Sequence, residues 1–293
     1  MHTSKFFSVS LLVICTALLA VGYSGAVSSG VQKTYELKYQ LPVGTKFIMT
    51  SMGATEIVTD QMGTEVAVDI QSEGKDIYVV TGEQGNGLSI EVEMGERTQD
   101  VSSMMGSDST DYSELVGKKV KFVLLPNGEV EGYAGFEDLP EITTATGEKL
   151  TEELYRLGVE ETFPKLPEKS VKLGDTWSDT EDREMPLEQG SLLTASDFTY
   201  RVLEEITRDG IECLKIEVAG TTKLSGEFEQ QGNSLSMERE VKSSGFLYFA
   251  HQQGMFIGME MDSRAEGVIT VLNAGIDLPQ TITSKGTVTV RFE

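Results

Sequence analysis

The histidines and cysteines of the chain limit the chemistry that it can perform. The sequence holds two of each, and one of each, His2 and Cys15, falls in the first residues. Only His251 and Cys213 remain beyond that segment. An ordinary zinc site takes four ligands of these types, so the pair excludes one. We expect Cys213 to be a buried structural thiol, with a catalytic thiol paired to His251 as the alternative.

Sequence motifs that position catalytic groups are also missing. The chain has no Gly-x-Ser-x-Gly elbow, no Gly-Lys-Ser/Thr phosphate loop and no His-Glu-x-x-His. With 47 Asp and Glu residues, paired-carboxylate chemistry stays open as an alternative, but the sequence singles out no pair. We therefore predict that the protein is not an enzyme and needs no cofactor.

One methionine-rich stretch could bind an apolar ligand. In Gly254-Met-Phe-Ile-Gly-Met-Glu-Met261, alternation would align four side chains on one face of a strand. Methionine suits surfaces that accept varied apolar partners, and it also fills ordinary cores. The candidate ligand-binding residues, with an ordinary core as the alternative, are Met255, Ile257, Met259 and Met261.

Two acidic stretches could attract calcium, which prefers oxygen ligands. Asp108, Asp111 and Glu114 lie three residues apart, and Asp179–Glu184 is a second acidic run. Neither spacing is that of an EF-hand. We favour solvated acidic loops and no metal site, and leave calcium at Asp108–Glu114 as an open alternative.

The N-terminus has the features of a signal peptide. Lys5 precedes an apolar run at Phe6–Val21, and Ser24-Gly25-Ala26 offers the small residues of a cleavage site. The run is short for a membrane span. We predict cleavage between Ala26 and Val27 and no stable membrane insertion afterwards, with an uncleaved anchor as the alternative. Cys15 lacks the preceding small residue of a lipobox.

The net charge limits the classes of partner that the protein can bind, and the cysteine content excludes an intrachain disulfide. The formal net charge is −23, which opposes binding to nucleic acid or anionic lipid head groups. With a single cysteine after the signal, no intrachain disulfide can form, so burial must supply stability outside the cell. An apolar small molecule or a protein remains as a partner.

Period-2 alternation dominates the chain and predicts many antiparallel strands. The segment Lys33–Tyr39 alternates strictly, Asn86-Gly87 and Pro126-Asn-Gly128 predict hairpins, and Ser102–Glu114 predicts a mobile loop. We expect ten to thirteen strands. The only Trp, Trp177, is expected to anchor the core.

A single helix is predicted from a different period. Leu150, Leu154 and Leu157 recur at helical spacing, and Gly158 can end the helix. Pro164 and Pro167 then favour extended chain. We expect this helix to pack on the sheet.

Short segments recur along the sequence at a constant offset, which indicates an internal duplication. Leu88–Glu93 recurs as Leu214–Ala219, an offset of 126 residues (214 − 88), and Gly128 recurs as Gly254 at the same offset (254 − 128). We predict a mainly β protein of two tandem antiparallel units that form a strongly curved sheet (a half-barrel) or a β-sandwich. The predicted segments are a signal peptide at 1–26, a first unit at 27–140, a helical linker at 141–170 and a second unit at 171–293.

These turn and strand signals resemble an uncharacterised family of exported bacterial β-proteins, a domain of unknown function. The resemblance covers most of the chain after the signal and implies no functional residues. At the level of architecture, a curved sheet with a helix across it is similar to LolA-type envelope lipid carriers. The residues that carry the family resemblance are Tyr35, Leu37, Tyr39, Gly44, Gly117, Pro126, Asn127, Gly128, Pro167, Gly174, Asp175, Trp177 and Gly254.

The expected function is therefore an exported, non-enzymatic binding protein of the periplasm, cell envelope or extracellular space. An apolar ligand held in the concavity of the sheet is the leading hypothesis. A structural or protein-interaction module is the alternative, and a carboxylate-based enzyme is a weaker one.

Overall fold

The computed structural model describes residues 33–147, 149–187, 190–230 and 232–293. The predicted signal peptide, its cleavage site and Cys15 lie outside the described residues. None of the helices in these ranges is long and apolar enough to span a membrane.

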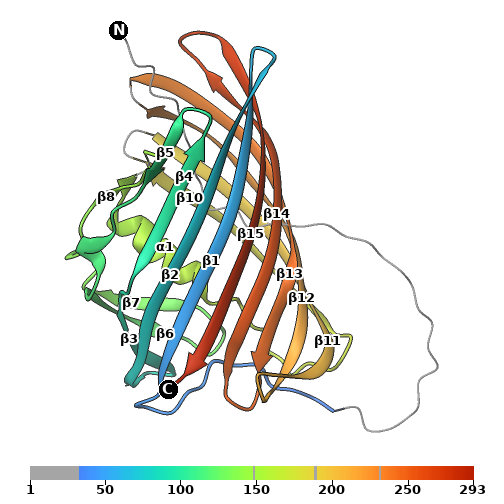
Figure 1. Ribbon diagram of the computed structural model, residues 1–293. Helices are drawn as coiled ribbons and strands as arrows, with labels where there is room; N and C mark the ends of the chain where they lie inside the picture. Colours follow the sequence, from blue (N-terminus) through green and yellow to red (C-terminus); the bar gives the residue numbers. More distant parts are fainter. Residues whose placement is uncertain (1–32, 148, 188–189, 231) are drawn as a thin grey trace.

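A single 13-stranded antiparallel sheet dominates the structure and curves strongly along its length (Figure 1). Its strands are joined mostly by tight turns, and neighbours in sequence are mostly neighbours in the sheet. The order across the sheet is β10 (Thr176–Leu187), β11 (Gly190–Arg208), β12 (Ile211–Gln230), β13 (Asn233–Ala250), β14 (Met255–Val271), β15 (Ile276–Phe292), β1 (Lys46–Gln61), β2 (Thr64–Gln84), β3 (Gly87–Glu93), β6 (Lys119–Leu124) and β7 (Val130–Ala134).

The mainly β fold and the curved half-barrel are thus confirmed. The last strand, β15, pairs with the first, β1, from Phe47 opposite Phe292 to Thr59 opposite Gln280. Strands from both predicted units therefore belong to one sheet. Among the described strands, β10 and β7 are the edge strands at the two ends of this order, and β5, which pairs with β4, is a further edge. Leu88–Glu93 and Leu214–Ala219 both lie in strands, β3 and β12. The division into two duplicated units stays a prediction.

The predicted helix is α1 (Glu152–Thr162), and it begins after the extended Thr151. Two details of the prediction are wrong. Leu150 lies in β9 (Lys149–Leu150), which pairs with β8 (Ile142–Thr143), and Gly158 does not end the helix. The helix continues because burying Val159 and Phe163 outweighs the modest helix penalty of one glycine.

The predicted mobile loop at Ser102–Glu114 is also wrong. Most of it forms a hairpin of β4 (Arg97–Ser103) and β5 (Gly106–Ser109), followed by the short 3-10 helix η1 (Ser113–Leu115). β4 pairs with β2, from Gly74 opposite Arg97 to Val68 opposite Ser103. Backbone pairing with an existing strand supplies order that the polar composition does not reveal.

The N-terminal segment Lys33–Tyr39 alternates as predicted, with Tyr35, Leu37 and Tyr39 buried. It is not a strand of the sheet, however. One isolated bridge joins Tyr35 to Val171, and single hydrogen bonds fasten the segment elsewhere. It runs as an extended strap across the lower end of the sheet in Figure 1, with one face on the core and the other exposed.

Buried apolar side chains fill the interior at the end of the sheet where β15 ends. This end lies lower in Figure 1. The largest core cluster, here called the lower cluster, joins inward side chains of the sheet to α1, the strap and the chain after the helix. Phe163 lies at its centre, with ring contacts to Tyr39, Tyr78, Phe122 and Phe256. Trp177 stacks on Tyr200 at 5.1 Å, so its predicted anchoring role is confirmed.

Candidate functional site on the concave face

Two further apolar clusters follow the lower cluster along the concave face. Side chains two residues apart on a strand share a face, so the cluster members can be read off the strand register. The middle cluster contains Ile57, Ile70, Leu224, Val241, Ala265 and Ile282. The upper cluster contains Met185, Leu192, Phe228, Leu235, Met237 and Ile269, against which Leu154, Leu157, Leu187, Val271 and Leu278 pack.

A buried arginine separates these two clusters. On the inward face of β13, Arg239 lies between Met237 of the upper cluster and Val241 of the middle cluster. It is 5% exposed. Its Nη2 donates a hydrogen bond of 2.7 Å to Oε1 of Gln280, and Nε2 of Gln280 donates one of 3.0 Å to Oγ1 of Thr59. A polar line thus crosses the sheet from β13 to β1.

The charge of Arg239 has no counter-ion among the described residues. Its Nη1 is buried and has no hydrogen-bond partner there. Burial lowers the pKa of the guanidinium to about 10, and no nearby carboxylate raises it again. The group therefore stays charged at neutral pH while it is largely removed from water.

Small polar side chains occupy the concave face between the lower and middle clusters. Thr55 donates to Ser284 at 2.9 Å, and Ser263 donates to the carbonyl of Ser284 at 3.3 Å. Ser243 is fully buried, and its Oγ has no partner among the described residues. Such a group is usually satisfied by a buried water or a ligand.

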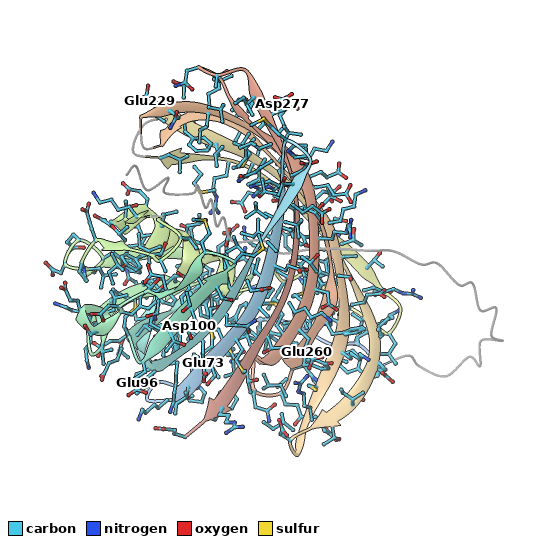
Figure 2. The ribbon with its side chains drawn as sticks, turned by 45° about the horizontal axis from the view of Figure 1, so that its top comes forward. Glu73, Glu96, Asp100, Glu229, Glu260 and Asp277 are labelled. Atoms are coloured by element: carbon cyan, nitrogen blue, oxygen red, sulfur yellow. The ribbon has the colours of Figure 1, made fainter. Side chains whose placement is uncertain are left out.

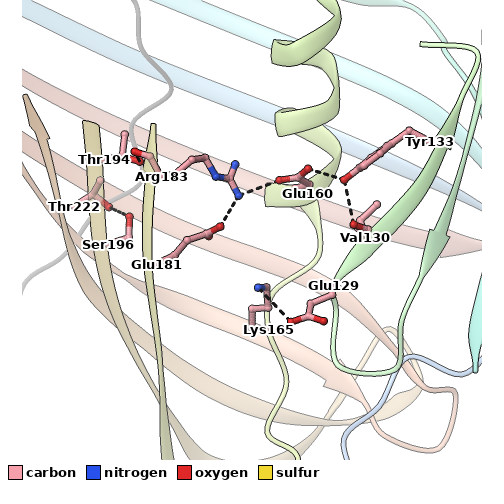
Figure 3. A network of polar contacts seen from close by, with 10 residues as sticks. All are labelled: Glu129, Val130, Tyr133, Glu160, Lys165, Glu181, Arg183, Thr194, Ser196 and Thr222. Carbon is pink, nitrogen blue, oxygen red and sulfur yellow. Dashed lines mark hydrogen bonds and ion pairs between the residues drawn. The ribbon is translucent and has the colours of Figure 1, made fainter. Parts of the chain in front are cut away.

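The helix α1 lies between the two edge strands and links them through Glu160 (Figure 3). Oε2 of Glu160 pairs with Nη2 of Arg183 in β10 at 2.9 Å, and Tyr133 in β7 donates its hydroxyl to Oε1 at 2.6 Å. Arg183 also pairs with Glu181 at 2.7 Å. Polar contacts to one helix therefore join the edges, which do not pair with each other.

Beside this contact, a pocket of about 210 Å³ opens between α1 and β10. Leu154, Leu157 and Met185 line it, and all three belong to or pack on the upper cluster. Charged residues form the rest of its wall, including Glu153 and Arg183. The pocket is thus an opening toward the upper cluster from the solvent.

Two acidic groups, Glu161 on α1 and Asp179 on β10, have raised pKa values. Desolvation raises the pKa of Glu161 to about 7, and the nearby Glu181 and Glu160 add to the rise against the opposing effect of Arg183. The pKa of Asp179 is likewise raised by desolvation. Other acidic residues are exposed, and five of these are labelled in Figure 2: Glu73, Glu96, Asp100, Glu229 and Asp277.

The methionine-rich strand lies in the packed core. Met255 and Met261 are buried in the lower cluster, and Met259 packs against it. Ile257 does not share their face. A β-bulge where β13 pairs with β14 reverses the alternation, and Ile257 packs on the other face with Cys213 and Tyr248. The candidate site described here is therefore a different part of the concave face.

The other residues that the sequence suggested as functional do not form a common site among the described residues. Cys213 is buried, as predicted for a structural thiol, and desolvation raises its pKa. His251 contacts the ring of Tyr35 and lies 3.7 Å from Glu205, with no contact to Cys213 found in the described part of the chain. Within the same part, no group of three His, Cys, Asp or Glu residues is placed to hold a metal ion. The Asp108 and Asp111 carboxylates accept backbone hydrogen bonds from Ser109 and Ser113.

Sequence reasoning missed Arg239, although a signal was present. In Leu235-Ser-Met-Glu-Arg-Glu-Val241, Arg239 shares its parity with Leu235, Met237 and Val241, while the glutamates have the opposite parity. Strict period-2 reading of this stretch would have placed a lone cation on the buried face.

No family model matches the chain, and no curated protein matches it. Among solved structures, a protein from Bacteroides fragilis thought to be exported, with a YmcC-like fold, is 8% identical and covers 88% of this chain and 99% of its own, with a TM-score of 0.25. An outer membrane channel from Pseudomonas putida F1 is 10% identical and covers 91% and 100%, with a TM-score of 0.26. The monoaromatic hydrocarbon channel CymD is 7% identical and covers 85% and 89%, with a TM-score of 0.22. Likenesses at these values carry no argument about what this chain binds.

Proposed function

We propose that the protein is an exported, non-enzymatic binding protein that holds an apolar ligand on the concave face of its sheet. The observation that carries the proposal is the upper cluster, which reaches a solvent-facing pocket between α1 and β10 through Leu154, Leu157 and Met185. Apolar walls with a few charged groups at the rim are typical of small-molecule sites. The ligand therefore lies beyond the filled lower cluster.

Export is supported by the sequence before the described residues. The apolar run Phe6–Val21 and the small residues that end at Ala26 favour a cleaved signal. The periplasm, the cell envelope or the extracellular space is the proposed location. N-terminal sequencing of the secreted protein tests this, and we expect Val27 as its first residue; a retained Met1 would contradict cleavage.

The absence of enzymatic activity is part of the proposal. Cys213 and His251 do not contact each other in the described residues, and the acidic groups near the pocket lie beside Arg183. This arrangement supports a binding role over a nucleophilic one.

Uptake of a neutral apolar dye, N-phenyl-1-naphthylamine, tests the ligand proposal. The protein should enhance the dye fluorescence, and Leu157→Gln at the pocket should weaken the binding severalfold because a polar amide replaces part of the apolar wall. Leu193→Gln is the matched control, because Leu193 is 55% exposed and belongs to none of the three clusters. No dye uptake by the wild type, or equal affinity in Leu157→Gln, would contradict the proposal.

A protein-interaction module is the second candidate, favoured by exposed methionines. Met62, at the turn between β1 and β2, is 87% exposed, and Met104 and Met105, at the turn between β4 and β5, are 80% and 68% exposed. Flexible methionines suit varied apolar partners. A partner captured from envelope extract should be lost when all three are replaced by Ser and retained by the control Met52→Ser.

A further inference from the structure

The positive charge of the buried Arg239 is not neutralised by any carboxylate among the described residues. Removing an ionised side chain from water is costly unless the charge is paired. The sequence holds 47 acidic residues, yet Arg239 contacts the neutral Gln280 and leaves Nη1 without a partner in the described residues.

The surrounding residues hold the guanidinium in place. Gly267 of β14 lies directly opposite Arg239, and a Cβ at Gly267 would come within 2.9 Å of the Cβ of Arg239. The missing side chain leaves a path across β14 to Gln280 on β15. Gln280 is fixed in turn by Thr59. The arginine is therefore oriented by neutral groups, which leave its charge uncompensated.

The apolar residues next to Arg239 indicate what kind of anion could bind there. Met237, Ile269 and Leu278 of the upper cluster lie next to Arg239 and Gln280 on the same face. The upper cluster continues to Leu154 and Leu157 at the pocket. An anion bound at Arg239 would thus adjoin the apolar side chains of a cluster whose other end lines the solvent-facing pocket.

We propose that Arg239 binds the carboxylate of a long-chain alkyl carboxylate, whose hydrocarbon chain lies along the upper cluster toward the pocket between α1 and β10. This inference rests on the proposed function and names the ligand class of that site. A single cation with one free terminal nitrogen matches a monoanion. A phosphate monoester carries nearly two charges and would need a second basic group.

The surface charge explains why the cation lies inside. A net charge of −23 repels anions at long range, and salt screens such repulsion beyond about 8 Å at physiological ionic strength. Selective capture of a carboxylate therefore requires a buried cation at short range. We expect the association rate of the ligand to rise with salt concentration.

Competition with the bound neutral dye tests the inference, with dodecanoate, 1-dodecanol and dodecyl phosphate as competitors. The wild type should prefer dodecanoate over 1-dodecanol by about tenfold, the effect of one charge-assisted hydrogen bond. Arg239→Met should lose this preference and bind dodecanoate no more tightly than 1-dodecanol, because the carboxylate would then be buried without a counter-ion. Arg264→Met is the matched control, because Arg264 on β14 has a side chain that is 63% exposed and should keep the preference.

Each result separates the two proposals. If the wild type takes up no dye, the proposed function fails together with the inference. If the dye binds but dodecanoate does not displace it, the inference alone fails. Equal displacement by acid and alcohol in the wild type overturns the inference alone, and so does tighter binding of dodecyl phosphate. If Arg239→Met does not fold, as judged by circular dichroism, Arg239→Gln replaces it, and an unchanged preference in that variant overturns the inference.

Discussion

The backbone N–H of Gln40 donates a hydrogen bond of 2.9 Å to the carbonyl oxygen of Gly254. The next residue back, Tyr39, donates its N–H to the carbonyl of Pro126 at 2.9 Å, beside Gly128. Gly128 and Gly254 are the two glycines that the sequence relates by the 126-residue offset (254 − 128). The strap is therefore fastened by both turns of the proposed duplication.

Gly254→Ala should lower the free energy of unfolding by about 2–4 kcal/mol. Gly254 has φ +68°, and a Cβ there would lie 2.4 Å from the carbonyl oxygen of Gln40. Gly275→Ala is the control for backbone strain alone, because its φ is +64° and a Cβ would meet nothing within 4 Å. Urea unfolding followed by Trp177 fluorescence measures both, and equal losses would show that the strap contact contributes nothing.

Glu160→Gln should cost about 1 kcal/mol of unfolding free energy, because it weakens the contacts to Arg183 and Tyr133 that join the edge strands. Glu153→Gln on the same helix is the control, since its side chain is exposed. The difference between the variants should shrink in high salt. A difference that does not depend on salt would indicate a packing effect.

Glu161 should make the protein less stable as the pH rises from about 4.5 to about 7. Its pKa in the folded state, about 7, lies above the ordinary value of 4.5, so the folded state binds the proton more tightly than the unfolded state in this window. Because the Glu161 side chain is exposed to solvent, screening weakens the effect of desolvation on its pKa, and we predict the direction of the stability change only.

Glu161→Gln removes this titration. Thermal melts of both proteins between pH 4 and pH 8 should show that the variant gains stability relative to the wild type as the pH rises. A constant difference across that range would contradict the raised pKa.

Arg239→Met should leave the ligand-free protein as stable as the wild type, or more stable by about 1 kcal/mol, because an apolar side chain replaces a buried uncompensated charge. Gln280 loses its hydrogen-bond donor, which limits the gain. Urea unfolding of delipidated protein measures the difference. A loss of several kcal/mol would mean that Arg239 is a structural residue.

The sequence predicts the fold class well because alternation and turn residues act locally. Sequence patterns do not predict strands that form because they pair with a neighbouring strand. The β4–β5 hairpin is one such case, since its exposed residues Gly106–Ser109 have no apolar pattern. Sequence patterns also fail at bulges, since one extra residue moves Ile257 to the opposite face.

The candidate site was harder to predict than the fold. Arg239 has the parity of a core residue, but only the register with Gly267 and Gln280 shows how its side chain crosses the sheet. The pocket depends on how α1 approaches β10, which sequence periodicity does not determine.

Native mass spectrometry of the protein, with and without added dodecanoate, tests the central claim most directly. One dodecanoate should bind per wild-type chain and be released on denaturation, and at the same subsaturating concentration a smaller fraction of Leu157→Gln should carry it. A chain that stays bare at saturating dodecanoate and takes up no neutral dye would contradict a ligand site on the concave face.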